Sequence, residues 1–306
     1  MQIIDGKATA ALLQERIAAQ VDELVAQGNR RPHLAAVLVG HDVASETYVA
    51  NKLRACVQCK IDSTLVRLED DVTEQQILDE IDRLNANPEI DGFIVQLPLP
   101  PHINANRVIE AIDYHKDVDG FHPMNVGLMS LGLPCILPAT PQGILMLFEQ
   151  YNIPTRGANC VVVGRSNIAG RPIASMLARK CQPGDCTVTL CHSETKNLKE
   201  ITRQADILIT AVGKPGLITA DMVKEGAAVL DMGITRLPST TAAGGYRLCG
   251  DVDFDNVAPR CSFITPVPGG VGPMTIASLM LNTLLAAQGT VYNDDDITGD
   301  VFVNKE

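Results

Sequence analysis

The sequence has 306 residues, which is enough for two domains of ordinary size, and its 46% hydrophobic and 20% charged residues are typical of a soluble globular protein. The formal net charge of −11 argues against binding to a nucleic-acid backbone, and the absence of Trp together with only 4% aromatic residues argues against a base-stacking surface. No run of 18 apolar residues occurs, so we expect no membrane span.

The cysteines and the N-terminus favour a cytoplasmic location. The segment MQIIDGKATA has no long apolar core, so we expect no signal peptide. Nine scattered cysteines in such a chain are typical of reduced cytosolic thiols. Cys56 and Cys59 form a C-x-x-C pair, but the pair lies in a helical pattern without a second pair or a nearby downstream His. We therefore expect no metal site and no redox centre.

The first 120 residues alternate between strand and helix patterns. The expected elements are a helix at 7–27, a strand at 34–39, a helix at 43–58, a strand at 62–68, a helix at 73–86, a strand at 90–95 and a helix near 104–113. Such β-α-β-α-β order predicts a parallel sheet with helices on its faces.

Polar side chains gather where this sheet presents the carboxyl ends of its strands. On the helix at 43–58, Ser45, Tyr48 and Lys52 are spaced to share one face. Gln96 follows the strand at 90–95, and Asp119 lies in a turn further on. Open α/β sheets place their chemistry at this edge, and an amide beside a buried lysine leaves the amine free to act as an acid or a base.

A segment rich in Pro and Gly at 122–142 predicts the crossover to a second domain. The elements expected after it are a helix at 142–151, strands at 159–163, 187–191, 206–211 and 227–231, helices at 170–180, 196–204 and 219–224, short strands near 246–249 and 262–264, and a last helix at 273–288. The last helix is apolar enough to be largely buried, and we expect it to pack against the first domain. Five acidic residues against Lys305 in 291–306 predict a solvated, mobile tail.

The stretch VVVGRSNIAGRP at 161–172 reads as a strand, a glycine-bearing turn and a helix. Gly164 provides the tight turn and Gly170 allows close approach, so backbone N–H groups at the helix start can hold a pyrophosphate. The spacing G-x-S-x-x-x-G departs from G-x-G-x-x-G, so a turn without a ligand remains an alternative. Arg165 and Ser193 favour NADP over NAD, whereas Glu194 would repel a 2′-phosphate, so NAD remains possible.

Five motifs together resemble one enzyme family. They are A-S-x-x-Y-x-x-x-K (44–52), DGFIVQLPLP (91–100), KDVDGFHPMNVG (116–127), GRSNIAGRP (164–172) and PVPGGVGPMT (266–275). In this order they resemble the bifunctional methylenetetrahydrofolate dehydrogenase/cyclohydrolase (FolD) family, over residues 3–288.

The resemblance implies an α/β fold of two domains with a cleft between them, usually assembled as a homodimer. The folate-binding catalytic domain would comprise 1–140 and 272–290, the Rossmann-like NAD(P)-binding domain 141–271, and the tail 291–306. The implied function is that of an oxidoreductase and hydrolase of one-carbon metabolism, which supplies purine biosynthesis. It oxidises 5,10-methylenetetrahydrofolate with NADP and then hydrolyses the methenyl product to 10-formyltetrahydrofolate.

The resemblance also implies roles for individual residues. Lys52 is the acid/base of the hydrolysis, Gln96 orients it, and Asp119 binds the pterin. Tyr48 stacks on the folate, and Ser45 lies in the same pocket. The loop over the folate is formed by Pro268, Gly269 and Gly270, and the cofactor contacts are Gly164, Arg165, Ser166, Ile168, Ser193, Gly213, Ile234 and Thr275.

The sequence departs from the family pattern at Ala139, at Glu194 and in the DMGIT motif (231–235). Two other functions remain open: a monofunctional NAD-dependent dehydrogenase, and a nucleotide-binding module without turnover. The complete set of polar residues around Lys52 favours the bifunctional enzyme.

Overall fold

The computed structural model describes residues 1–239 and 245–292 and divides the chain into two compact units. The unit that contains Lys52 comprises Ala11–Ala139 and Ile276–Glu306, and we call it the Lys52 unit. The other comprises Met1–Ala10 and Thr140–Thr275, and we call it the Gly164 unit. All of the predicted tail beyond residue 292 lies outside the described residues.

The Lys52 unit is built on a parallel three-stranded sheet in the order β3-β2-β4. Its elements are β2 (His33–Val39), α2 (Val43–Gln58), β3 (Asp62–Leu68), α3 (Glu74–Ala86), β4 (Gly92–Val95), α4 (Ala105–Ala111) and α5 (Pro123–Leu131), with most of α1 (Gly6–Ala26) and α10 (Val271–Gln288). The central strand β2 is buried on both faces, which explains why it reads as a continuous apolar run.

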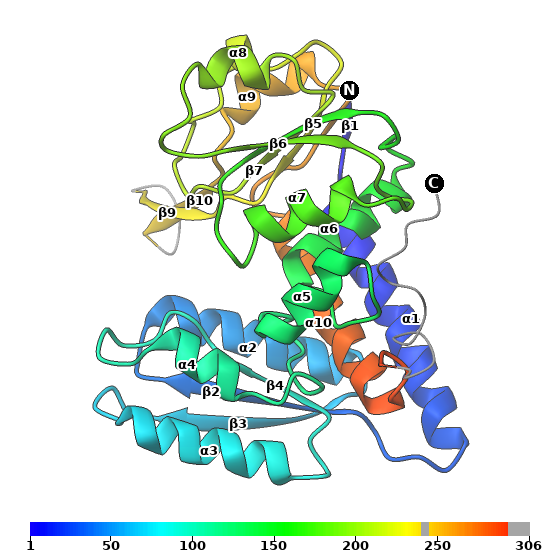
Figure 1. The fold of residues 1–306 in the computed structure, drawn as a ribbon, viewed down its shortest axis with the longest axis vertical. Coiled ribbons are helices and arrows are strands. Elements are labelled where there is room, and N and C mark those ends of the chain that lie inside the picture. The colour runs from blue at the N-terminus through cyan, green and yellow to red at the C-terminus, as the bar shows by residue number, and fades with distance from the viewer. Residues whose placement is uncertain (240–244, 293–306) are drawn as a thin grey trace. The chain divides into compact units, whose positions relative to one another are not determined.

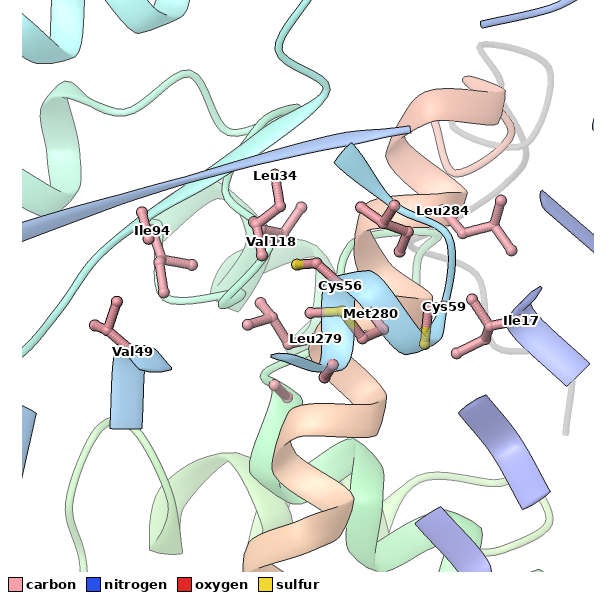
Figure 2. Packing of buried hydrophobic residues seen from close by; sticks show 14 of the residues in the cluster. Ile17, Leu34, Val49, Cys56, Cys59, Ile94, Val118, Leu279, Met280 and Leu284 are labelled. Carbon is pink, nitrogen blue, oxygen red and sulfur yellow. The ribbon is translucent and has the colours of Figure 1, made fainter. Parts of the chain in front are cut away.

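Alternate residues of β2 enter two separate cores. Leu34, Ala36 and Leu38 pack with α2, α1 and α10, as Figure 2 shows for part of this cluster. Ala35, Val37 and Val39 pack on the opposite face with α3 and α4. The helices therefore cover both faces, with α2 and α3 on opposite sides of the sheet (Figure 1).

The Gly164 unit contains a six-stranded parallel sheet in the order β1-β11-β8-β7-β5-β6. Its elements are β1 (Gln2–Ile3), α6 (Ala139–Gln150), β5 (Asn159–Val163), α7 (Gly170–Ala178), β6 (Thr187–Cys191), α8 (Leu198–Thr202), β7 (Ile207–Thr210), β8 (Ala228–Asp231), β9 (Thr235–Pro238), β10 (Tyr246–Cys249), α9 (Phe254–Val257) and β11 (Phe263–Ile264). Two 3₁₀ helices, η1 (Ala220–Met222) and η2 (Ala258–Arg260), complete it, and β9 pairs with β10 as an antiparallel hairpin.

The structure differs from the sequence-based expectation at several places, among them β9 and α9, which were not expected. The first ten residues group with the Gly164 unit, not with the first domain, because β1 adds to the edge of β11. The crossover at 122–142 contains a helix, α5. The helix expected at 219–224 is only the 3₁₀ turn η1. Tyr292, placed in the mobile tail, instead packs against the Lys52 core with its hydroxyl hydrogen-bonded.

Helix α10 is long and apolar enough, by composition alone, to cross a membrane, and half of that stretch is buried inside the structure. Its residues Leu279, Met280 and Leu284 belong to the core that also holds α2 (Figure 2). The burial of these residues accounts for the apolar composition of α10, and the helix packs into the Lys52 unit as the sequence predicted.

The C-x-x-C pair points into the same core. Cys56 and Cys59 are both free thiols with no exposed surface (Figure 2). Burial raises the pKa of each thiol to about 12. Because a thiol is reactive as the thiolate, both side chains act here as small apolar residues.

Candidate active site of the Lys52 unit and nucleotide turn of the Gly164 unit

Lys52 is a buried lysine, with 8% of the residue exposed. Its Nζ donates a hydrogen bond to Oε1 of Gln96 at 3.2 Å and lies 3.9 Å from Oδ1 of Asp119. The sequence predicted that these three side chains would meet, and the structure brings them together. A buried amine with one amide and one carboxylate partner is suited to proton transfer.

Local structure explains how α2 presents Lys52. Asp42 caps the helix by accepting the backbone N–H of Ser45 at 2.7 Å. Val49 and Cys56 anchor α2 in the core. Of the three polar residues expected on one face, Ser45 and Lys52 are buried, whereas Tyr48 keeps 41% of its surface exposed.

Gln96 has a fixed orientation at the end of β4. Its backbone N–H donates to the Val37 carbonyl at 2.9 Å, and its Nε2 donates to the Leu97 carbonyl at 2.6 Å. The amide oxygen is therefore left to face Lys52. The following Leu97–Pro98 peptide is cis.

Asp119 lies in a turn whose backbone is held from several sides. The buried carboxylate of Asp117 accepts the N–H groups of Gly120 at 3.1 Å and His122 at 2.7 Å. Nδ2 of Asn282, on α10, donates to the Val118 carbonyl at 2.9 Å. Burial raises the pKa of Asp117, and the bonds from His122 and Asn125 oppose that shift.

In the Gly164 unit, the turn between β5 and α7 is closed by two glycines. Gly164 has φ +122°, and a Cβ on Gly170 would lie 1.9 Å from the Gly164 carbonyl oxygen. Helix α7 starts without a side-chain cap, but the Arg171 N–H donates to the Ser166 carbonyl at 3.1 Å and Pro172 has no N–H. Among the first three residues of the helix, Gly170 is therefore the one that can offer its N–H to an anionic ligand. Arg165, Ser166 and Ile168 are exposed on this turn, and Ser193 is exposed after β6.

Two further loops at the carboxyl edge of the same sheet are fixed by buried carboxylates. Asp251 accepts the N–H groups of Val212 and Lys214, both at 2.7 Å, on either side of Gly213. Asp231 accepts the N–H of Gly233 at 2.8 Å, next to the exposed Ile234. Burial raises the pKa of Asp231, with its backbone hydrogen bonds acting in the opposite direction.

The segment 266–275, a loop followed by the first residues of α10, also belongs to the Gly164 unit. Its Val267–Pro268 peptide is cis, and the Gly269 carbonyl accepts the N–H of Lys7 at 2.9 Å. Gly270 is so close to Gly6 that a Cβ on Gly6 would lie 1.7 Å from the Gly270 oxygen. The Thr275 hydroxyl lies 2.9 Å from that of Thr140.

Sequence reasoning missed the residues that hold these loops. Asp231, Asp251, Asn282, Asn125 and Tyr292 were not singled out, although each makes a buried or partly buried hydrogen bond. No local pattern distinguishes Asp251, Asn282 and Tyr292, because their partners are distant in sequence, up to 178 residues away for Tyr292.

Two family models match the chain in sequence order. The model for the tetrahydrofolate dehydrogenase/cyclohydrolase catalytic domain matches residues 4–119, and the model for its NAD(P)-binding domain matches residues 138–291. The chain belongs to the tetrahydrofolate dehydrogenase/cyclohydrolase family. The family resemblance and the α/β fold predicted from the sequence are thereby confirmed.

Members of the tetrahydrofolate dehydrogenase/cyclohydrolase family match nearly the whole chain. The protein of Phocaeicola vulgatus named "Bifunctional protein FolD" is 59% identical over 292 residues, which is 95% of this chain and 100% of that protein. The FolD structure from Campylobacter jejuni is 45% identical with a TM-score of 0.89, covering 94% of this chain and 99% of the other.

A third member, the Trypanosoma brucei dehydrogenase-cyclohydrolase in complex with NADP and an inhibitor, is 38% identical. Its TM-score is 0.90, and the match covers 95% of this chain and 98% of that one. As a member of this family that matches its relatives over nearly their whole length, the chain is a bifunctional enzyme with dehydrogenase and cyclohydrolase activities.

Proposed function

We propose that this enzyme oxidises 5,10-methylenetetrahydrofolate with NADP and hydrolyses the resulting methenyl cation to 10-formyltetrahydrofolate, with Lys52 as the acid/base of the second step. One observation carries this proposal: Lys52 is buried, with its Nζ 3.2 Å from the Gln96 amide oxygen and 3.9 Å from the Asp119 carboxylate. In this proposal the Lys52 unit performs the folate chemistry and the Gly164 unit binds the nucleotide.

The hydrolysis requires a group that moves protons. Water adds to the methenyl carbon, the bond from that carbon to N5 breaks, and N5 gains a proton, with one proton released overall. The Lys52 amine can take the proton from water and pass one to N5. Gln96 holds the amine in place through its oxygen, because its Nε2 is already engaged by the Leu97 carbonyl.

The other polar residues of the Lys52 unit would bind the folate. Asp119 has a carboxylate that can accept N–H groups of the pterin, and its side chain is 16% exposed. Tyr48 is exposed enough for its ring to stack on the folate, and Ser45 lies one turn of α2 away. These roles rest on the positions of the side chains and on the family's motifs.

The oxidation needs no protein base, because the lone pairs of N5 and N10 stabilise the cation that forms. Bound NADP supplies the hydride acceptor, so the contribution of the protein is to position it. The glycine-closed turn between β5 and α7, with the Gly170 N–H at the start of the helix, fits a pyrophosphate. The residues proposed to hold the cofactor are Gly164, Arg165, Ser166, Ile168, Ser193, Gly213, Ile234 and Thr275.

A coupled absorbance assay tests the proposed function. The protein is mixed with methylenetetrahydrofolate and either NADP or NAD, and the reduced cofactor and the methenyl compound are followed together. Reduced cofactor with little methenyl accumulation supports both proposed reactions. Accumulating methenyl compound would indicate a dehydrogenase alone, and no change would indicate a binding module.

The preference for NADP can be tested at Glu194. This exposed carboxylate follows Ser193 in the turn after β6, where it would repel a 2′-phosphate. Glu194→Gln is expected to lower the KM for NADP by about 3- to 10-fold at low salt, with the KM for NAD nearly unchanged. Glu200→Gln, on exposed α8, is the control. An unchanged or higher KM for NADP would show that Glu194 does not face the phosphate.

Asp251 provides a test of the Gly213 loop. Its two carboxylate oxygens accept the backbone N–H groups of Val212 and Lys214. An asparagine would place an NH₂ group against one of these N–H groups, and that hydrogen bond would be lost. Asp251→Asn is expected to raise the KM for NADP by about tenfold and to leave cyclohydrolase activity within twofold. Asp253→Asn, an exchange of the same kind nearby, is the control. Equal losses of both activities would contradict a local effect on the cofactor loop.

We also propose that the enzyme acts as a homodimer in the cytoplasm, as the family's members usually do. The prediction is a solution mass of twice the 32.8 kDa of one chain. Light scattering during gel filtration measures that mass, and a value of one chain would exclude a stable dimer.

A further inference from the structure

Tyr292 closes a hydrogen-bonded chain that leads to the turn carrying Asp119. It follows α10 and lies one residue beyond the family's matched region, which ends at residue 291. Its hydroxyl lies 2.5 Å from Oδ1 of Asn125 and 3.0 Å from the Tyr114 carbonyl, and it accepts the N–H of Ile136 at 3.4 Å. Burial raises the pKa of this phenol, so the hydroxyl remains a hydrogen-bond donor.

Asn125 is the second link. It is fully buried on α5, and its Nδ2 donates to Oδ2 of Asp117 at 3.1 Å and to the Tyr114 carbonyl at 2.9 Å. Since a carboxylate can only accept, the amide must present Nδ2 to Asp117 and its oxygen to Tyr292. Asp117 and the Tyr114 carbonyl therefore fix which way this amide points, and the Tyr292 hydroxyl donates to the amide oxygen that remains.

Asp117 is the third link, and it acts directly on the turn. Asp117 precedes Asp119 in the chain, and its two oxygens accept the backbone N–H groups of Gly120 and His122, which follow Asp119. The turn is thus closed around Asp119, whose Oδ1 lies 3.9 Å from Lys52. A shift of this turn would move the carboxylate relative to the lysine, and such positions tolerate little displacement.

We propose that Tyr292 is a positioning residue for the folate site, acting through Asn125 and Asp117 on the turn that holds Asp119. This inference rests on the function proposed above for Asp119. It assigns a task to the segment that follows α10: a hydroxyl from that segment completes a buried polar network, in which each group satisfies the next.

The substitution Tyr292→Phe isolates the hydroxyl. The ring of Tyr292 contacts Tyr114 and His115 edge to face, at 5.3 and 4.8 Å between centroids, and phenylalanine keeps those contacts. We expect the KM for the folate substrate to rise about 5- to 10-fold, with the KM for NADP unchanged. Tyr151→Phe is the matched control, because it removes a hydroxyl bonded to the Asp5 backbone in the Gly164 unit.

A double-mutant cycle with Asp119→Asn decides whether Tyr292 acts through Asp119. If it does, Tyr292→Phe changes the folate KM by less than twofold once Asp119 is replaced. The same increase in both backgrounds, or no increase in the wild-type background, would overturn the inference. If Asp119→Asn alone leaves folate binding and turnover intact, the role proposed for Asp119 fails instead.

Asn125→Ser breaks the network at its second link and provides an independent check. The expected pattern is again a higher folate KM with the NADP KM unchanged. A purely structural role would reduce the amount of active enzyme, lowering both rates together without changing either KM. If both Tyr292→Phe and Asn125→Ser lowered the two rates together and left both KM values unchanged, a positioning role would be rejected.

Discussion

Lys52→Met is expected to abolish cyclohydrolase activity while dehydrogenase activity persists. Methionine has about the length of lysine but no titratable group, so it fills the space beside Gln96 without moving protons. The expected loss is about 10²-fold or more in the hydrolysis rate. The oxidation should continue, because hydride loss from the methylene carbon requires positioning and no protein base.

Accumulation of the methenyl compound measures the loss of cyclohydrolase activity with dehydrogenase activity retained. In the wild type it should be hydrolysed as it forms, whereas in Lys52→Met it should accumulate as the cofactor is reduced. Lys60→Met is the control, because Lys60 is an exposed lysine of the same unit, paired with Asp22. Hydrolysis by purified Lys52→Met at a near wild-type rate would show that the role given to Lys52 is wrong.

Gly170→Ala is expected to have the opposite effect on the two activities: it should weaken the dehydrogenase and spare the cyclohydrolase. The added Cβ would lie 1.9 Å from the oxygen and 2.6 Å from the carbon of the Gly164 carbonyl, so the turn must open to accommodate it. Overpacking against backbone costs about 1–3 kcal/mol, and here the strain falls on the proposed pyrophosphate site. We expect NADP binding to weaken by about tenfold or more, with hydrolysis of added methenyl compound retained.

Cofactor titration and the two activity assays test this variant, with circular dichroism to confirm folding. Gly127→Ala is the matched control, because a Cβ at Gly127 would meet no atom within 4 Å. An NADP affinity within twofold of the wild type would mean that the turn does not bind the cofactor. Loss of hydrolysis as well would indicate that the substitution disturbs more than the Gly164 unit.

Much of the fold follows from local patterns. The ranges of α2, β3, β5, β6 and β10 agree with the sequence-based expectation. Lys52 and Gln96 could also be paired in advance, because β2 and β4 are neighbours in a parallel sheet and their carboxyl ends share an edge. Such placement needs only strand order, and strand order follows from the βαβ rule.

Other features were missed, either because their local signals were masked or because they depend on distant contacts. Helix α5 had local signals, since Pro123 starts it and Gly132 ends it at φ +75°, but the abundance of Pro and Gly masked them. β1 has only two residues, too few to show a period, and it exists because β11 offers it an edge. Tyr292 precedes an acidic run that suggested a solvated tail. Its position in the Lys52 unit becomes clear only from its hydrogen bonds to Asn125 and Tyr114.

The chain passes between its two units three times, after Ala10, Ala139 and Thr275, and both α1 and α10 contain one of these crossings. Neither unit is therefore a continuous stretch of polypeptide, and no single cut in the gene yields one unit without the other. Deleting either unit would cut through α1 and α10, whereas a point substitution such as Lys52→Met can silence one activity and leave both helices intact.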